Sequence, residues 1–377
     1  MRFKTLVDFG LAMWASRKTP VTLCVLGKPG IGKTASARAL AEAMTEYRRN
    51  KDPEAPQAIC WVVDLSSCLP EDLNGLPFRG PDGVTHYAPQ AWMAELCRPG
   101  VYGVLVLDDL PAASPSVQVA SRQISLERRV HEARLSDGVI IMVTGNRRED
   151  KSNAATLPAH FRNSVCMLDI EVDVEEWATW AGSQPDINPV VPAFLRWKPS
   201  HLARTPADAD SRGSYATPRS WAMLGRLYDT AHSKGVQTDV AFGLVGDGVA
   251  TEFLAFAKLR DSLIDPKAVL KDPKGAVPNP RASLDTPDKQ IAMCTSLAEY
   301  AVMAIRDGGK EVKKNTPRDF LRAIAWVTAH NREFVATAVA TYTSNGGAVP
   351  MLVAAVRENA NDPEIRPLMD FLGRAFK

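Results

Sequence analysis

The sequence predicts an α/β fold in which a parallel sheet carries helices on both faces and is followed by helical regions. Almost continuously apolar runs alternate with helical stretches through the first half of the chain, and such runs are typical of parallel strands buried on both faces. Beyond Glu171 the composition changes from strand-like to helical. We therefore expect a five-stranded parallel sheet, with strands at residues 21–26, 58–65, 101–107, 139–144 and 165–170.

The composition is that of an ordinary soluble protein with two or three domains. Of the 377 residues, 45% are hydrophobic and 23% are charged, and 45 basic residues against 43 acidic ones give a net charge of +2. This balance gives no general attraction to nucleic acid. The six cysteines form no C-x-x-C pair, and no apolar run approaches the length of a membrane span. We therefore expect a cytoplasmic protein with reduced thiols, neither secreted nor embedded in a membrane.

A glycine-rich stretch with the pattern G-x-x-x-x-G-K-T joins the first predicted strand to an alanine-rich helical run. Glycines in this context let the backbone wrap closely around a phosphate, and the start of the helix presents N–H groups and its positive dipole end to the anion. The lysine of the pattern reaches the β- and γ-phosphates, and the threonine hydroxyl binds Mg²⁺. The sequence thus predicts a nucleotide site formed by Gly27, Pro29, Gly30, Ile31, Gly32, Lys33, Thr34 and Ala35.

Polar residues follow two of the later strands. Asp108 and Asp109 end the third apolar run, and Asn146 follows the fourth. Because open α/β sheets bind ligands at the carboxyl ends of their strands, we expect Asp108 to share Mg²⁺ with Thr34. Asp109 is predicted to act as a general base on a water molecule, and Asn146 to orient that water. The simpler alternatives are solvated acids at a strand end and a turn-forming asparagine.

A hairpin inserted into a helical region is predicted between Asn74 and Tyr87, where glycine turns flank an alternating segment. Inserted loops on a rigid core often carry function, so this hairpin is the expected place of contact with a partner. Phe78, His86 and Tyr87 are then exposed contact residues. Alternatively, they pack against the neighbouring strand.

The second half of the chain is predicted to be helical. One helix begins with Thr217 as N-cap and Pro218 at its first position. Arg219 lies in the first turn, where the helix dipole disfavours a cation, and is either a phosphate contact or an ordinary solvated arginine. Further helices are expected over 246–259 and from Pro317 to Thr343. The predicted organisation is an α/β nucleotide-binding domain at 1–171 with an insert at about 74–88, a helical domain at 172–265, a linker at 266–287 and a helical extension at 288–377.

The order of these features resembles the AAA+ ATPases of the MoxR type, a group that also contains the dynein-related and McrB-like modules with an insert in helix 2. The resemblance covers roughly residues 6–259. Residues 171–177 and 243–248 are similar to bacterial and phage members of the group. The motifs that carry the resemblance are Gly27–Thr34, the inserted hairpin, Leu107–Asp109, Gln123–Val130, Thr144–Asn146 and Ala216–Trp221.

The resemblance implies a P-loop AAA+ core, a helical lid and a helical C-terminal extension. It also implies a ring, usually hexameric, with ATP and Mg²⁺ bound between neighbouring subunits. Lys33 and Asp108 would belong to one subunit, with Asn146 as sensor 1 and Arg219 as sensor 2, and an arginine finger would come from the next subunit. The implied task is chaperone-like remodelling of a protein partner, often one with a von Willebrand A-type domain. The setting would be the bacterial cytosol, or the host cytosol for a phage protein.

Two positions depart from the pattern of that group. Asp109 stands where relatives usually have glutamate, and its shorter side chain would hold a water less well. Ser164 stands where the finger arginine would align. Arg162 is the nearest substitute, although two residues of displacement amount to several ångströms. Arg147 or Arg148 could serve instead.

Three functions are compatible with these observations. The leading one is a ring-forming ATPase that remodels or assembles a protein partner. The second is a nucleotide-gated scaffold with little hydrolysis, which Asp109 and Ser164 both favour. The third is a nucleic-acid motor, for which the pairs Arg128–Arg129 and Arg147–Arg148 are groove or pore candidates. The near-neutral charge argues against this third function.

Overall fold

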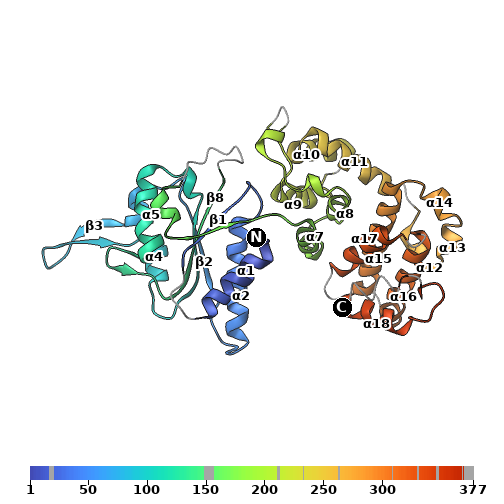
Figure 1. Cartoon of the computed structure of the whole chain (residues 1–377), viewed down its shortest axis with the longest axis horizontal. Coiled ribbons are helices and arrows are strands. Elements are labelled where there is room, and N and C mark those ends of the chain that lie inside the picture. Colours follow the sequence, from blue (N-terminus) through green and yellow to red (C-terminus); the bar gives the residue numbers. More distant parts are fainter. Residues whose placement is uncertain are drawn as a thin grey trace. The chain divides into compact units, whose positions relative to one another are not determined.

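The structure is a computed structural model in which the chain forms two compact units (Figure 1). The first unit holds residues 1–173 and 205–207, and the second holds 174–204 and 208–377. No helix within the described residues is both long and apolar enough to cross a membrane. The structure describes residues 1–16, 21–147, 157–209, 213–231, 233–261, 264–307, 309–328, 331–344, 348–366 and 368.

The first unit is built on a five-stranded parallel sheet, which confirms the sequence prediction. The strand order is β2-β5-β8-β1-β9, and every neighbouring pair runs parallel. Asp64 at the end of β2 lies opposite Asp108 at the end of β5, and Leu26 of β1 lies opposite Gly145 of β8. The carboxyl ends of the strands therefore form one edge, where open α/β sheets bind ligands. The strands are β1 (Leu23–Leu26), β2 (Ile59–Asp64), β5 (Tyr102–Asp108), β8 (Gly138–Gly145) and β9 (Cys166–Asp169).

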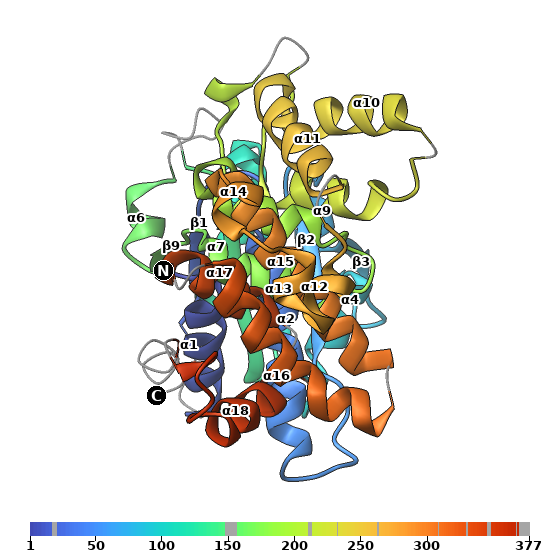
Figure 2. The same cartoon turned by 90° about the vertical axis from the view of Figure 1, so that its right-hand side faces the viewer.

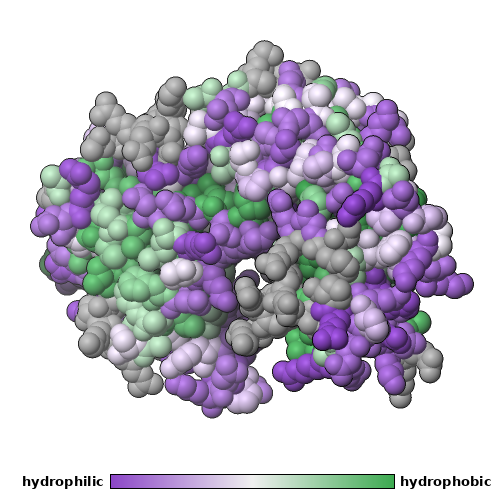
Figure 3. Space-filling model, turned by 45° about the vertical axis from the view of Figure 1, so that its right-hand side comes forward, coloured by the Kyte–Doolittle hydropathy of each residue, from purple (hydrophilic) through white to green (hydrophobic). Residues whose placement is uncertain are grey.

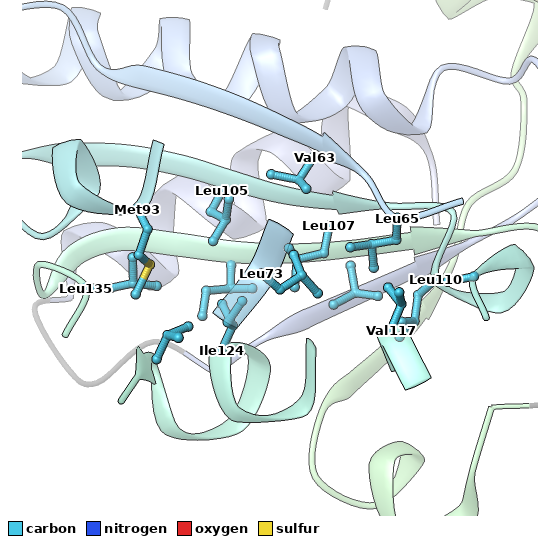
Figure 4. Packing of buried hydrophobic residues seen from close by; sticks show 14 of the residues in the cluster. Val63, Leu65, Leu73, Met93, Leu105, Leu107, Leu110, Val117, Ile124 and Leu135 are labelled. Atoms are coloured by element: carbon cyan, nitrogen blue, oxygen red, sulfur yellow. The ribbon is translucent and has the colours of Figure 1, made fainter. Parts of the chain in front are cut away.

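Each face of the sheet has its own hydrophobic core, because alternate residues of a strand point to opposite faces. Val104 and Val106 of β5 belong to the core on one face, and Leu105 and Leu107 belong to the other, which Figure 4 shows. Burying such a side chain contributes about 1.5–3 kcal/mol. The valine face carries α1 (Phe3–Ala15) and α2 (Lys33–Arg49), and the leucine face carries α3 (Pro70–Asn74), α4 (Ala91–Leu96), η1 (Leu110–Ala112), α5 (Pro115–Glu127) and α6 (Ala159–Arg162).

Two antiparallel hairpins belong to the first unit. The first hairpin, β3 (Leu76–Arg79) and β4 (Thr85–Ala88), is the one that the sequence predicts (Figure 1). The second, β6 (Arg129–Val130) and β7 (Ala133–Arg134), is missing from the sequence prediction. It was missed because each strand is only two residues long, which is too short for an alternating pattern.

The first hairpin is partly exposed and partly packed. The Phe78 side chain is 50% exposed. His86 pairs with Asp82 inside the hairpin, at 2.8 Å between Nε2 and a carboxylate oxygen. The ring of Tyr87 stacks on the ring of His131 in the turn of the second hairpin, with centroids 3.7 Å apart. Thus Phe78 is exposed and its contact with a partner stays a prediction, whereas Tyr87 packs against the second hairpin.

The described residues of the second unit form helices and connecting segments. Its central helix, α15, packs against α11, α12, α16 and α17, and Figure 2 shows these helices from a second side. The 3₁₀ turn η4 (Pro206–Asp208) has residues in both units. The helices are α7 (Val174–Ser183), α8 (Val190–Trp197), η3 (Pro199–His201), α9 (Pro218–Leu227), α10 (Lys234–Val245), α11 (Asp247–Asp261), α12 (Pro266–Lys271), α13 (Pro273–Ala276), α14 (Pro280–Ser283), α15 (Pro287–Asp307), α16 (Lys310–Val327), α17 (Arg332–Thr343) and α18 (Val349–Glu358).

The structure corrects the helix that the sequence predicts to begin at Pro317. This residue lies inside α16, and a separate helix, α17, ends at Thr343. Phe320 and Ile324 of α16 are fully buried. Packing of this apolar face outweighs the hydrogen bond that the proline removes.

The predicted linker at 266–287 contains three short helices. Each begins with a proline at its first position, after an Asp or Asn that accepts a hydrogen bond from a backbone N–H. Val269, Val277 and Leu284 are buried. The prolines therefore mark helix starts in a packed segment, and the domain boundaries stay a prediction.

Candidate functional site

The glycine-rich loop connects β1 to α2 at the carboxyl edge of the sheet. Gly30 and Gly32 have φ angles of 73° and 101°, a left-handed backbone that glycine adopts without steric cost. Gly32 is the N-cap of the 17-residue helix α2. The first N–H groups of a helix have no carbonyl one turn earlier to bond to. The loop therefore presents N–H donors and the positive dipole end of a helix to an anion.

Lys33 is held at this loop by three oxygen atoms. Its Nζ donates to the backbone oxygens of Gly27 at 2.9 Å and Lys28 at 3.0 Å. It also donates to Oδ1 of Asn146 at 2.8 Å. Asn146 directly follows β8, the strand next to β1 in the sheet. The fold thus brings together two predicted site residues that are 113 positions apart in the sequence.

Asp108 at the end of β5 faces two hydroxyl groups. The hydroxyl of Thr34 lies 3.2 Å from each of its carboxylate oxygens. The hydroxyl of Thr144, in β8, donates to Oδ1 of Asp108. Hydroxyl and carboxylate oxygens are the hard donors that Mg²⁺ prefers. The pair of Thr34 and Asp108 therefore fits the predicted metal site.

Asp109 lies beside this pair in a strained backbone conformation. Its φ and ψ angles are 57° and 42°, in the left-handed region, which costs a non-glycine residue about 1 kcal/mol. Its backbone N–H donates to the hydroxyl of Thr144 at 3.3 Å. Its Oδ1 is buried and has no hydrogen-bond partner in the part of the chain that the structure describes. Strained residues with unpartnered polar atoms are concentrated at functional sites.

Burial raises the pKa of the Asp109 carboxyl above its ordinary value. The negative charges of Asp108 and Asp64 raise this pKa further, and the positive charge of Lys33 opposes them. A carboxylate with a raised pKa is a stronger base than an ordinary one. The raised pKa is compatible with the predicted role of Asp109 as a general base, and that role stays a prediction.

The arginine-finger candidates of the first unit differ in their surroundings. Arg162, the last residue of α6, and Ser164 are both exposed. Arg147 lies 3.7 Å from a carboxylate oxygen of Asp169 in an ion pair within the same subunit, and Arg148 lies outside the described residues. Among the described candidates, Arg162 is thus the one on the open surface.

Arg128, one of the residues predicted to contact nucleic acid, is buried and has a structural role. It is 7% exposed, and one guanidinium nitrogen donates to the backbone oxygens of Ser136 and Val139 at 2.9 and 2.7 Å. Arg129 is exposed and pairs with Glu127. The pair Arg128–Arg129 therefore does not form the basic groove that a nucleic-acid motor would need.

Arg219 lies in the second unit, on the first turn of α9. Thr217 caps this helix by accepting a hydrogen bond from the N–H of Ser220 at 3.1 Å, and Pro218 is at the first position. The predicted helix start is thus confirmed. The Arg219 side chain is exposed, and its role at the phosphate site stays a prediction.

Thr144 belongs to one of the motifs of the family resemblance, but the sequence analysis gave it no role at this site. It contacts both acidic residues at the end of β5, although it is 36 positions from Asp108 in the chain. The available signal was a polar residue in an otherwise apolar strand, two positions before the predicted sensor Asn146. Neither position nor residue type indicated which group its hydroxyl would contact.

The chain thus combines a glycine-rich phosphate loop, a five-stranded parallel sheet with an acidic strand end, and helical regions after the sheet. No protein-family model matches the chain, and no curated protein matches it in sequence. The chain is similar to solved structures at low identity. A point mutant of RuvB from Thermotoga maritima gives a TM-score of 0.38 at 15% identity, over 76% of this chain and 83% of that one.

Two further solved structures show the same degree of likeness. The ORC2 protein of Aeropyrum pernix, in ADPNP and ADP complexes, gives a TM-score of 0.37 at 12% identity, over 93% of this chain and 94% of that one. PCH-2 of C. elegans gives 0.32 at 12% identity, over 87% and 69%. At these identities and TM-scores, the likeness identifies neither the family nor the activity of this chain.

Proposed function

We propose that the chain is an AAA+ ATPase of the MoxR type that hydrolyses ATP with Mg²⁺ and uses the energy to remodel or assemble a protein partner. One observation carries the nucleotide part of this proposal. The ammonium group of Lys33, the amide of Asn146 and the pair of Thr34 and Asp108 meet at one edge of the sheet. These groups come from three separate segments of the chain, and each has the chemistry that a bound nucleotide triphosphate requires.

Each residue of the site has a role that follows from its contacts. Lys33 exchanges its present oxygen partners for phosphate oxygens, and the N–H groups of the loop hold the same anion. Thr34 and Asp108 would hold Mg²⁺, which when bound would supply positive charge to the transferred phosphoryl group. Asp109 accepts the proton of the attacking water, and Asn146, bonded to Lys33, fixes one side of the water's position. For Arg219 the role rests on the family resemblance alone, which assigns it to the phosphate charge as sensor 2.

The more specific part of the proposal concerns ring formation and the protein partner. Arg162 is exposed at the end of α6, as a residue that acts in a neighbouring subunit must be. Leu76, Phe78 and Val84 of the first hairpin are between 50% and 60% exposed. Figure 3 shows that hydrophobic side chains gather on the left-hand part of the face in view. Such surfaces are typical of protein contacts. A partner with a von Willebrand A-type domain and a hexameric ring follow from the family resemblance alone.

The first test is steady-state ATPase activity per subunit over a range of protein concentrations. Lys33→Ala provides the background, because it removes the phosphate-binding cation and leaves the loop backbone intact. A rate that rises with concentration is expected, since a neighbouring subunit completes the site. Wild-type protein that binds ATP with Mg²⁺ but hydrolyses it no faster than Lys33→Ala would contradict the proposal.

A second measurement tests the finger. Arg162→Ala is expected to lower the rate by about 10³-fold or more. The matched control is Arg134→Ala, which removes another exposed arginine of the first unit, one whose side chain is 71% exposed. Restored turnover when Arg162→Ala subunits are mixed with Lys33→Ala subunits would show that the two residues act across an interface. Equal rates for Arg162→Ala and Arg134→Ala would remove Arg162 from the site.

A nucleotide-gated scaffold is the second candidate function, because Ser164 leaves the expected finger position without an arginine and Asp109 has a short side chain. In this case ATP drives assembly with negligible turnover. Assembly that depends on ATP and is unchanged in Asp109→Ala would favour the scaffold. Brisk hydrolysis by the wild type would exclude it.

A further inference from the structure

We propose that Thr144 is a positioning residue that orients both acidic side chains of the site through its single hydroxyl group. The proposal rests on the proposed ATPase function, which supplies the roles of Asp108 and Asp109. Thr144 contacts neither the phosphate loop nor Lys33 through any hydrogen bond that the structure describes. It therefore acts on the reaction only through its two acidic neighbours.

The directions of the two hydrogen bonds follow from the chemistry of the groups. An ionised carboxylate can only accept, so the hydroxyl proton of Thr144 goes to Oδ1 of Asp108. The lone pairs of the same hydroxyl oxygen are then available to accept the N–H of Asp109, at 3.3 Å. The two bonds reinforce one another, because a hydroxyl that donates to an anion becomes a better acceptor.

The bond to Asp109 holds a conformation that the chain would otherwise avoid. Asp109 is left-handed, and it directly precedes η1. The hydrogen bond to its N–H offsets part of the cost of this backbone and fixes the direction in which the side chain leaves the chain. The Oδ1 of Asp109 is buried and has no hydrogen-bond partner within the described residues, so its acceptor capacity is not used by another protein group.

Solvent cannot take over the function of the hydroxyl, because Thr144 is completely buried. Thr144→Val keeps the shape of the side chain and removes the hydroxyl, so it leaves the Asp109 N–H without an acceptor. Thr144→Ser keeps the hydroxyl and removes only a methyl group. Thr22→Val is a matched control: Thr22 is also a buried threonine of the first unit, 5% exposed, and its hydroxyl donates to the backbone oxygen of Ser125.

The experiment compares kcat, KM and nucleotide affinity for these three variants and the wild type. Thr144→Val is expected to lower kcat by about 10- to 100-fold, the range of one hydrogen bond to a charged group, with KM changed less than about threefold. Thr144→Ser is expected to keep at least about a third of the wild-type kcat, and Thr22→Val to keep it within about twofold. Affinity for a fluorescent ATP analogue should be unchanged by Thr144→Val in EDTA and lowered, by less than about threefold, in Mg²⁺, because Asp108 loses the hydroxyl that orients it toward the metal.

Two results would overturn the inference. One is a kcat for Thr144→Val within twofold of the wild type. The other is the pattern of a general packing defect, in which Thr144→Val and Thr22→Val lose activity equally or Thr144→Ser does not restore it. If the wild type itself does not hydrolyse ATP, the proposed function fails, and the effect of Mg²⁺ on nucleotide affinity alone decides the role of Thr144.

Discussion

Arg196 of α8 provides a sharp test of how the C-terminal helices are held in the second unit. Its side chain is 2% exposed. The guanidinium donates to a carboxylate oxygen of Glu175 at 3.0 Å, and to the hydroxyls of Thr341 and Ser344 in and after α17 at 3.2 and 2.6 Å. We expect that Arg196→Met, which keeps the apolar stem and removes the charge and the donors, loosens α17 from α8.

The size of the effect follows from what the substitution leaves behind. Breaking a buried ion pair costs about 3–5 kcal/mol when the remaining partner stays buried without compensation. Here Glu175 is 59% exposed and regains water. Thr341 and Ser344 keep the bonds that their hydroxyls donate to the backbone oxygens of Thr337 and Ala340. We therefore expect a smaller loss of about 2 kcal/mol.

Hydrogen exchange of the α17 backbone amides measures this loss of stability in the helix where it is expected. A loss of about 2 kcal/mol corresponds to exchange that is about 30-fold faster. The matched control is Arg226→Met: Arg226 pairs with Asp186 at 2.7 Å, but the two side chains are 45% and 55% exposed. Such a pair contributes no more than about 0.5 kcal/mol. Equal effects of the two substitutions, or unchanged exchange in α17 of Arg196→Met, would refute the reasoning.

Two further predictions concern residues at the carboxyl edge of the sheet. An alanine Cβ at Gly145 would lie 2.4 Å from Cδ of Pro111, so Gly145→Ala must displace η1 next to Asp109. We expect the free energy of unfolding to fall by about 1–3 kcal/mol, measured by thermal unfolding, and the ATPase activity to fall as well. The control is Gly243→Ala, where no atom lies within 4 Å of the added Cβ; it should stabilise α10 by up to about 1 kcal/mol. A Gly145→Ala variant with wild-type stability would contradict the packing argument. The ATPase rate should fall as the pH is lowered through the raised pKa of Asp109, since the base must be ionised. Asp64→Asn removes a neighbouring negative charge and so lowers that pKa, which should move the acidic limb of the pH profile to lower pH; a limb that does not move would exclude Asp109 as its source.

The parts of the site that are contiguous in sequence could be predicted, because their chemistry depends on local spacing. The phosphate loop and the acidic end of β5 are of this kind, and the strand order places them at the same edge. The bond between Lys33 and Asn146 follows once β1 and β8 are neighbours. The role of Thr144 was not predictable, because its partners are set by the register between β5 and β8 and by the left-handed turn at Asp109.

The sequence predicted some helix starts correctly and others incorrectly, and the difference depends on how each proline is packed. Pro218 begins a helix, as expected from its N-cap threonine. Pro317 has the same intrinsic preference, yet it lies inside α16, where the residues that follow it, with Phe320 and Ile324, form a buried apolar face. The local preference of a residue determines where a helix begins only when tertiary packing does not favour another position.

The stack of Tyr87 on His131 gives the first hairpin a mechanical anchor. The N–H of His131 donates to the side chain of Gln123 in α5 at 3.4 Å, and α5 follows the η1 turn that begins directly after Asp109. The exposed hairpin is therefore connected through two rings and one helix to the turn at Asp109. In the proposed function, the hairpin that binds the partner and Asp109 as the general base are joined by this one line of contacts.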